Sequence, residues 1–354
     1  MSFLKISEKI VLNKLKKIKN GNLKLINYDG KVFHFGSLES NLSADIKINN
    51  PKFYFNIISG GSSALGEAHM NRDFYTSNLT NLIEISAKNI ELVYSFSGSL
   101  KIKKIKNFFK SIFASNTKSK SLQYISKHYD LGNNFFSKWL DKTLTYSSAV
   151  YENENDSLEI AQKNKYQKLI DLLNVKDGNK VLEIGCGWGG FSEYLAKNYN
   201  VSIDCITISK KQFEFTKKRI SDAGLNNKVN VLFLDYRDLQ DKYDKIVSIE
   251  MIEAVGENYL GKYFETIKKS LNKDGSAALQ GITIRDDLFD RYKRSEDFIQ
   301  KYIFPGGFLP SVNLMKTLIK KNKLNLIKVN SYPDDYARTC LLYTSDAADE
   351  GHWV

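Results

Sequence analysis

A glycine-rich turn between a short apolar run and a helical pattern is the part of this sequence best suited to chemistry. Val181, Leu182 and Ile184 form a short apolar run suited to a buried parallel strand, and apolar residues recur at helical spacing from Phe191 onward. Gly185, Gly187 and Gly190 lie between them. Glycines at such a junction permit a positive φ and let a ligand approach main-chain N–H groups at the start of a helix. The turn therefore predicts a site for an adenosine-containing cofactor.

The spacing of these glycines alone does not identify the cofactor. Gly-x-Gly-x-x-Gly satisfies the dinucleotide fingerprint, and Asp204 lies about 20 residues further on, where a ribose-binding acid is expected. However, Glu183 precedes the glycines within the strand, and the next strand ends at Thr207 rather than directly in an acid. The third strand ends at Asp235 and Tyr236, where a carboxylate suits an adenine amino group. We therefore predict cofactor contacts from Glu183, Asp235 and Tyr236, in a pattern that favours S-adenosylmethionine over NAD.

A parallel sheet is needed to bring these residues to one edge. Helical stretches separate further strand-like runs, which fall at 201–206, 229–234, 243–249 and 276–282. Such alternation implies a parallel sheet with helices on both faces, whose ligands bind beyond the carboxyl ends of the strands. We expect an α/β fold of the class I methyltransferase (Rossmann-like) type, with a mostly parallel sheet, preceded by a small α+β N-terminal domain.

The N-terminal accessory domain is expected to span residues 1–98. Its strand-like runs alternate with turns and fall at 23–28, 32–36, 44–48 and 53–58. A helix is expected from Glu67 or Thr80. His34 and His69 lie here without partners at metal-ligand spacing, so we predict no metal site. This domain shows no catalytic constellation, and its expected work is docking or lipid contact.

Residues 99–120 are predicted to form a basic amphipathic helix and a polar linker. The isoleucines and phenylalanines can share one helical face, with lysines elsewhere. A basic helix with aromatic residues suits an interfacial membrane binder, whereas an inter-domain helix packed on the protein would show the same pattern. Both interpretations stay open. The methyltransferase domain is expected to follow over 121–339.

The charge and hydropathy of the chain restrict its expected partners and its expected cellular location. The chain has 354 residues and a formal net charge of +12, which indicates an anionic partner or, equally, the amino-acid bias of an A/T-rich coding sequence. A phospholipid membrane surface fits better than nucleic acid, because no RNA-binding aromatic signature or basic-region heptad is present. No apolar run reaches the roughly 18 to 20 residues of a spanning helix. We expect a cytoplasmic protein, peripherally associated with the inner face of the membrane; a homodimer is left open.

Ordered motifs across the chain carry a family resemblance. Besides the glycine turn they are Lys127–Phe136 (KHYDLGNNFF), Trp139–Asp141 (WLD), Tyr146–Ala149 (YSSA), Ile206–Ser209 (ITIS) with Gln212, Leu234–Asp238 (LDYRD), Ser248–Gly256 (SIEMIEAVG), Leu279–Thr283 (LQGIT) and Lys301–Ser311 (KYIFPGGFLPS). With them the chain resembles the cyclopropane-fatty-acyl-phospholipid synthase family. Its members transfer a methyl group from S-adenosylmethionine to a cis double bond of a phospholipid acyl chain. The resemblance covers nearly everything up to about Thr339.

The resemblance implies roles for particular side chains. The implied cofactor contacts are Tyr146, Ser147, Gly185, Gly187, Thr207 and Gln212. Ring closure requires a base, and the family is thought to hold a bicarbonate ion for it. The matching positions here are Ser148, Glu253, Gln280, Ile282 and Tyr336. Glu253 is the protein carboxylate favoured to orient that base. His128 is expected to order a lid over the site, with a catalytic role as the alternative.

Two positions depart from the family pattern. Ser148 stands where many members have Cys, and Gln280 stands where many have His. A glutamine cannot shuttle a proton at neutral pH, so proton removal would depend more on the bound anion and Glu253. A methyl- or methylene-branched acyl product is therefore one alternative, and a catalytically silent lipid-binding homologue is another.

Residues 340–354 break the resemblance, which would continue through a Trp-containing helix. The segment resembles translated synthetic DNA. We therefore expect 340–354 to be a non-native tail on a chain whose C-terminal part is missing.

Overall fold

The computed structural model describes residues 3–60, 63–96, 116–118, 120, 133–294 and 296–349. The chain divides into compact units, one formed by Met1–Phe113 with Arg291–Pro305 and the other by Ala114–Asp290 with Gly306–Val354. We call them unit 1 and unit 2. Unit 1 includes residues 291–305, which the sequence pattern assigns to the methyltransferase domain. His128 and the basic helix expected at 99–113 lie outside the described residues.

Unit 1 combines a small mixed sheet with short helices. The four-stranded sheet has the order β2-β1-β3-β4, with β1 parallel to β3 and antiparallel to β2. The strands are β1 (Asn22–Ile26), β2 (Val32–Gly36), β3 (Ser43–Ile48) and β4 (Phe74–Tyr75). The helical elements are α1 (Phe3–Leu15), α2 (Lys52–Gly60), α3 (Ser63–Met70), α4 (Leu79–Lys88), α5 (Ile90–Phe96) and the π-helical η3 (Ile299–Ile303).

The strand predicted at 53–58 is wrong, because this run lies in helix α2. Its buried residues are Phe53, Tyr54, Ile57 and Ile58, which is the spacing of one helical face rather than the alternation of a strand. The aromatic and β-branched composition favours a strand, but packing decides otherwise. The Phe53 ring meets that of Phe74 edge-on, with centroids 5.6 Å apart.

Unit 2 is built on a five-stranded sheet of order β7-β6-β5-β8-β9. Every pairing between these strands is parallel. The strands are β5 (Lys180–Ile184), β6 (Ser202–Thr207), β7 (Val229–Phe233), β8 (Tyr243–Ile249) and β9 (Leu271–Gln280). Residues 181–184 of the central strand are all buried, which explains why every residue among them except Glu183 is apolar. The predicted α/β fold with a parallel sheet is confirmed.

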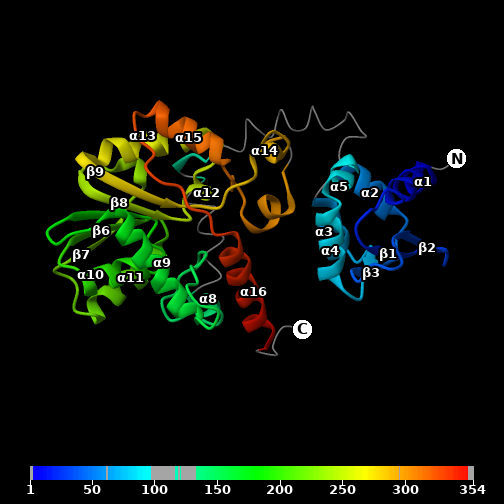
Figure 1. The fold of residues 1–354 in the computed structure, drawn as a ribbon, viewed down its shortest axis with the longest axis horizontal. Helices are drawn as coiled ribbons and strands as arrows, with labels where there is room; N and C mark the ends of the chain where they lie inside the picture. The colour runs from blue at the N-terminus through cyan, green and yellow to red at the C-terminus, as the bar shows by residue number, and fades with distance from the viewer. Residues whose placement is uncertain are drawn as a thin grey trace. The chain divides into compact units, whose positions relative to one another are not determined.

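Helices cover both faces of this sheet. Figure 1 shows α9 (Leu158–Leu173), α10 (Gly190–Asn198) and α11 (Lys210–Asp222) on one side of it, with α13 (Leu260–Ser270) and α15 (Val312–Lys321) on the other. The shorter elements are α8 (Asn133–Phe136), η1 (Tyr236–Asp238), α12 (Ile252–Val255), η2 (Glu257–Tyr259) and α14 (Asp286–Tyr292). Helix α16 (Pro333–Asp349) continues through the start of the segment expected to be a non-native tail. Within the described ranges, none of the helices is long and apolar enough to cross a membrane.

Candidate active site

A cavity lies at the carboxyl ends of the strands of unit 2. In the sheet, β6 lies on one side of β5 and β8 lies on the other, so the loops that follow β5 and β8 diverge at this point. The structure brings every predicted cofactor residue to the cavity wall, namely Tyr146, Ser147, Glu183, Gly185, Gly187, Thr207, Gln212, Asp235 and Tyr236. Residues far apart in the sequence therefore share one pocket.

The glycine turn after β5 has a backbone that other residues would strain. Gly185 has a φ of 83°, and Gly187 has a φ of 52°. A Cβ at Gly185 would lie 2.9 Å from the Met251 side chain across the turn. The carbonyl of Gly187 accepts a hydrogen bond of 3.1 Å from Thr216 Oγ1. Glycine is therefore required here both by the positive φ and by the close approach of Met251.

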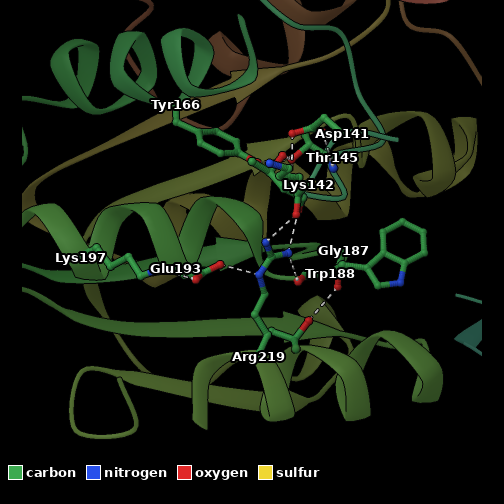
Figure 2. A network of polar contacts seen from close by, with 11 residues as sticks. Asp141, Lys142, Thr145, Tyr166, Gly187, Trp188, Glu193, Lys197 and Arg219 are labelled. Carbon is green, nitrogen blue, oxygen red and sulfur yellow. Dashed lines mark hydrogen bonds and ion pairs between the residues drawn. The ribbon is translucent and has the colours of Figure 1, made fainter. Parts of the chain in front are cut away.

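Arg219 of α11 fixes the segment 142–147 to the glycine turn (Figure 2). One guanidinium nitrogen donates to the Thr143 carbonyl at 2.7 Å and to the Trp188 carbonyl at 3.1 Å. Its Nε pairs with Glu193 of α10. A planar guanidinium with several donors can hold two chain segments at once. This bridge sets where the segment 142–147 places its side chains on the cavity wall.

Glu183 is a buried carboxyl group on the cofactor side. The Glu183 side chain accepts a hydrogen bond from the Ser192 hydroxyl, and Glu183 is only 3% exposed. Burial raises the pKa of Glu183 to about 8, against the opposing effects of the Ser192 hydrogen bonds and the positive charge of Lys165. A ligand that brings positive charge or N–H donors would favour the ionised form.

The acid after β7 already has a partner. Both carboxylate oxygens of Asp235 bind Arg237, with an Nε–Oδ1 distance of 2.8 Å and an Nη2–Oδ2 distance of 2.6 Å. Burial alone would raise the pKa of Asp235, but the Arg237 hydrogen bonds and charge lower it. Nearby, Thr207 Oγ1 donates to Gln212 Oε1 at 2.9 Å. Asp235 is thus an ionised acceptor on the wall of the cavity.

Glu250 was missed in the sequence analysis and lines the same cavity. It follows β8 directly and has a φ of 48°. Its Oε1 accepts hydrogen bonds from the Ser148 backbone N–H at 2.8 Å and from Gln280 Nε2 at 3.0 Å. The same Gln280 nitrogen donates to the Ser148 carbonyl at 3.0 Å. The predicted residues Ser148 and Gln280 therefore meet at Glu250. A carboxylate at the end of a parallel strand was the signal that could have found it.

Glu253, the favoured carboxylate, is half-buried on α12 and is not among the residues that line the cavity. Its Oε1 accepts a hydrogen bond from the backbone N–H of Ile282, another predicted residue. Its Oε2 is buried without a hydrogen-bond partner in the described part of the chain. Burial and the nearby charge of Glu250 raise the pKa of Glu253 to about 8. Glu253 is therefore predominantly a neutral carboxyl group at neutral pH.

Lys165 is a second residue missed in the sequence analysis. It lies on α9, is 1% exposed, and donates from Nζ to Ser147 Oγ at 2.6 Å. Burial lowers the pKa of Lys165 to about 8, although the charges of Glu250, Asp141 and Glu183 oppose this. In the sequence it is one of many lysines on a polar helix, and no spacing separates it from the exposed ones. It supplies a buried positive charge beside the carboxyl groups.

Aromatic rings cover the segment next to the cavity. The Tyr146 ring lies edge-on to Trp139, with centroids 5.1 Å apart, and 6.1 Å from the ring of Tyr343. The Tyr343 hydroxyl, from the expected tail, donates to the Ser147 carbonyl at 3.1 Å. Tyr336 on α16 does not line the cavity, but burial, Cys340 and Glu250 raise its pKa. His128 cannot be placed, since it lies outside the described residues.

Comparison with known sequences identifies relatives over most of the chain. Residues 116–350 match the family described as mycolic acid cyclopropane synthetase. The chain is 36% identical over 283 residues to the cyclopropane-fatty-acyl-phospholipid synthase of Escherichia coli (strain K12), covering 78% of this chain and 69% of that protein. It is 31% identical over 291 residues to the tuberculostearic acid methyltransferase of Mycobacterium tuberculosis, covering 80% of this chain and 68% of that protein.

Solved structures show the same relationship. The cyclopropane synthase MmaA2 from Mycobacterium tuberculosis has a TM-score of 0.61 and 30% sequence identity, with 65% of this chain and 84% of that chain covered. The mycolic acid cyclopropane synthase CmaA1, complexed with SAH and CTAB, has the same TM-score of 0.61 at 28% identity and the same coverage. The resemblance inferred from the motifs is confirmed, and the chain belongs to the mycolic acid cyclopropane synthetase family of S-adenosylmethionine-dependent methyltransferases.

Proposed function

We propose that this protein transfers the methyl group of S-adenosylmethionine to the cis double bond of an unsaturated phospholipid acyl chain, and that a cyclopropane ring closes when a proton is lost. The observation that carries this proposal is the shared cavity. All the predicted cofactor residues line it, and so does the half-buried Glu250, whose carboxyl group is suited to proton removal. The name of the Escherichia coli relative describes the same activity.

The cofactor side of the cavity fits S-adenosylmethionine, which supplies an electrophilic methyl group on a positively charged sulfur. The open backbone at Gly185 and Gly187 lets a ligand approach the main chain. The Tyr146 ring can stabilise a sulfonium through cation–π attraction. Glu183 would ionise beside positive charge, and Asp235 offers carboxylate oxygens to an amino group. The positive charge and an amino group of the ligand thus each have a chemically matched partner.

The acceptor side fits the charge that alkene methylation creates. A π bond that attacks a methyl group leaves a positive charge on the acyl chain. Carboxyl groups and aromatic faces near this charge would stabilise it in a site from which water is excluded. Glu250 and the ring of Tyr146 are both on the cavity wall. The same walls would shield the cation from hydrolysis.

The proposed substrate requires access to a lipid surface. We propose that the protein is cytoplasmic and associates peripherally with the inner face of the membrane. The net charge of +12 favours an anionic surface. The basic segment 99–120 is the predicted contact, and nucleic acid is not a proposed partner. Weaker binding to anionic vesicles at higher salt would support this.

A methyl- or methylene-branched product is the second candidate. The tuberculostearic acid methyltransferase matched at 31% identity motivates it, together with Gln280 at a position where many members have His. Both reactions share the methyl transfer and differ in where the proton is lost or whether a reductant intervenes. The product therefore distinguishes them.

The test uses the purified chain with S-adenosylmethionine and vesicles of a cis-unsaturated phosphatidylglycerol. Vesicles of the saturated lipid with the same headgroup are the matched control. We expect S-adenosylhomocysteine to accumulate only with the unsaturated lipid, and its acyl chains to gain the mass of one CH₂. Cofactor binding by calorimetry without any product would instead support a catalytically silent lipid-binding homologue.

A further inference from the structure

We propose that Glu250 occupies the place that the family resemblance gives to a bicarbonate ion, so that this protein removes the proton with a carboxylate of its own. The inference rests on the proposed function and deepens it. It assigns a catalytic residue that the sequence analysis missed, and it removes the need for a bound anion.

The hydrogen-bond donors predicted to hold the anion are already used. The Ser148 backbone N–H and Gln280 Nε2 both donate to Glu250 Oε1, at 2.8 Å and 3.0 Å. The backbone N–H of Ile282 donates to Glu253 Oε1. These donors therefore bind carboxyl oxygens of the protein itself, whereas the resemblance implies that they bind the oxygens of a bicarbonate ion. A bicarbonate ion would have to displace them.

Charge also opposes a further anion. Glu250 and Glu253 lie close enough for the charge of Glu250 to raise the pKa of Glu253. A second negative charge beside an ionised Glu250 would add repulsion where water cannot screen it. Lys165 is the buried cation whose charge acts on Glu250. The residues present therefore do not fit a bicarbonate ion beside an ionised Glu250.

The backbone at Glu250 supports a functional placement. A φ of 48° is unfavourable for a residue with a Cβ, because the Cβ comes too close to the following carbonyl oxygen. The backbone N–H of Glu250 donates to the Gln280 carbonyl at 2.8 Å, which ties the strained residue to β9. A glycine would hold this conformation without strain. The chain instead keeps a carboxylate there, on the cavity wall.

The surroundings of Glu250 favour its ionised form over that of Glu253. Burial raises the pKa of Glu250, while Lys165, the Ser148 N–H and Gln280 all act to lower it. Glu253 accepts a hydrogen bond from the Ile282 N–H, but burial and the negative charge of Glu250 raise its pKa to about 8. The other titratable groups that interact with Glu250 are Tyr146, Tyr336, Cys340 and Tyr343. Glu250 therefore ionises before Glu253, which keeps its proton to higher pH.

The chemical step balances without another reagent. The π electrons of the alkene form a bond to the methyl carbon, while the C–S bond breaks and its electron pair leaves with sulfur. A carboxylate oxygen of Glu250 takes a proton from the former methyl carbon. The electron pair of that C–H bond forms the second ring bond to the cationic carbon. Glu250 then loses its proton to water between turnovers.

The experiment measures product formation on unsaturated vesicles in buffers purged of carbon dioxide, with and without added bicarbonate. We expect the wild-type rate to change less than about twofold. Glu250→Gln keeps the size of the side chain but removes the base, so the rate should fall by about 100-fold or more while S-adenosylmethionine binding stays within a few-fold. Glu152→Gln is the matched control, because Glu152 is an exposed carboxylate that pairs with Lys168 and does not line the cavity. This variant should keep the wild-type rate.

Glu250→Gly provides the complementary test. It removes the carboxylate, relieves the strain that a positive φ imposes on a residue with a Cβ, and frees the Ser148 and Gln280 donors for an anion. Added bicarbonate should raise the rate of this variant by at least about tenfold, with no such effect on the wild type. Circular dichroism and cofactor binding would show whether each variant is folded.

The outcomes separate the two proposals. Wild-type activity that disappears without bicarbonate, or full turnover by Glu250→Gln, overturns the role of Glu250 but leaves the proposed function standing. Failure of the wild type to methylate any unsaturated lipid, with or without bicarbonate, contradicts the proposed function and the inference that rests on it.

Discussion

The donor side of the cavity and its carboxylate side are built in different ways. The donor side is shaped by backbone, with Gly185 and Gly187 at positive φ. The carboxylate side is a set of ionisable groups removed from water, in which Glu250 accepts hydrogen bonds and Lys165 supplies the opposing charge. The first side depends on steric fit, and the second depends on where protons reside.

This difference predicts different failures. A change on the donor side should weaken cofactor binding with little effect on the pH dependence of turnover. A change on the carboxylate side should leave cofactor binding largely intact but alter turnover and its pH profile, because each buried charge sets the pKa of its neighbours. A variant that changes cofactor binding can therefore be assigned to the donor side. A variant that changes the pH profile of turnover can be assigned to the carboxylate side.

Lys165→Met should give the largest effect. It removes the buried cation and leaves Glu250 without its opposing charge, so Glu250 takes up a proton more readily. We expect a loss of about 3–5 kcal/mol in the free energy of unfolding. Turnover at neutral pH should fall strongly, and the remaining activity should shift to higher pH. Denaturant unfolding and a pH–rate profile would measure both.

Lys163→Met is the matched control, because Lys163 lies on the same helix in an exposed pair with Glu159. It should change the free energy of unfolding by no more than about 0.5 kcal/mol. Combining Lys165→Met with Glu250→Gln should cost less than the sum of the single changes, since the double variant leaves no unpaired charge. Equal stability of Lys165→Met and the control would contradict the charge-balance account.

Gly185→Ala should have the next largest effect, on cofactor binding. It introduces a Cβ at a φ of 83° and within 2.9 Å of Met251, in the wall of the cavity. Gly178→Ala is the control, because Gly178 has a φ of 84° but no atom within 4 Å of the added Cβ. Both should lose about 1–2 kcal/mol of stability from strain. Calorimetry should show weaker S-adenosylmethionine binding only for Gly185→Ala; similar affinities in both would refute the steric role.

Glu183→Gln should have the smallest effect on stability at acidic pH, and should act instead on how stability without cofactor changes with pH. The pKa of Glu183 is about 8 in the folded protein against an ordinary value of 4.5, so its contribution to stability is fully present below 4.5 and is lost as pH rises through 8. The wild type should lose up to about 1.4 kcal/mol per pH unit from this group across that window. Glu183→Gln should flatten the decline measured by denaturant unfolding, and an unchanged slope would show that Glu183 is not buried as a neutral acid.

Local sequence signals predicted the donor side, but not the carboxylate side. Glycines after a strand and polar residues at strand ends have positions that the parallel sheet dictates. Glu250 lies at such a strand end, yet the motif comparison directed attention to Glu253, three residues later. Lys165 could not be found, because burial of one lysine on a polar helix depends on tertiary packing. Packing also made 53–58 a helix despite its strand-like composition.

Isotope retention tests the central claim most directly. The protein is incubated with unsaturated phospholipid vesicles and S-adenosylmethionine whose methyl group carries three deuterium atoms, and the released fatty acids are analysed by mass spectrometry and NMR. Loss of one deuterium ion from the transferred CD₃ group predicts a product that gains CD₂ and shows the cyclopropane ring protons of the two former alkene carbons. Retention of all three deuterium atoms in a methyl branch, or no transfer to lipid at all, would contradict ring closure by this protein.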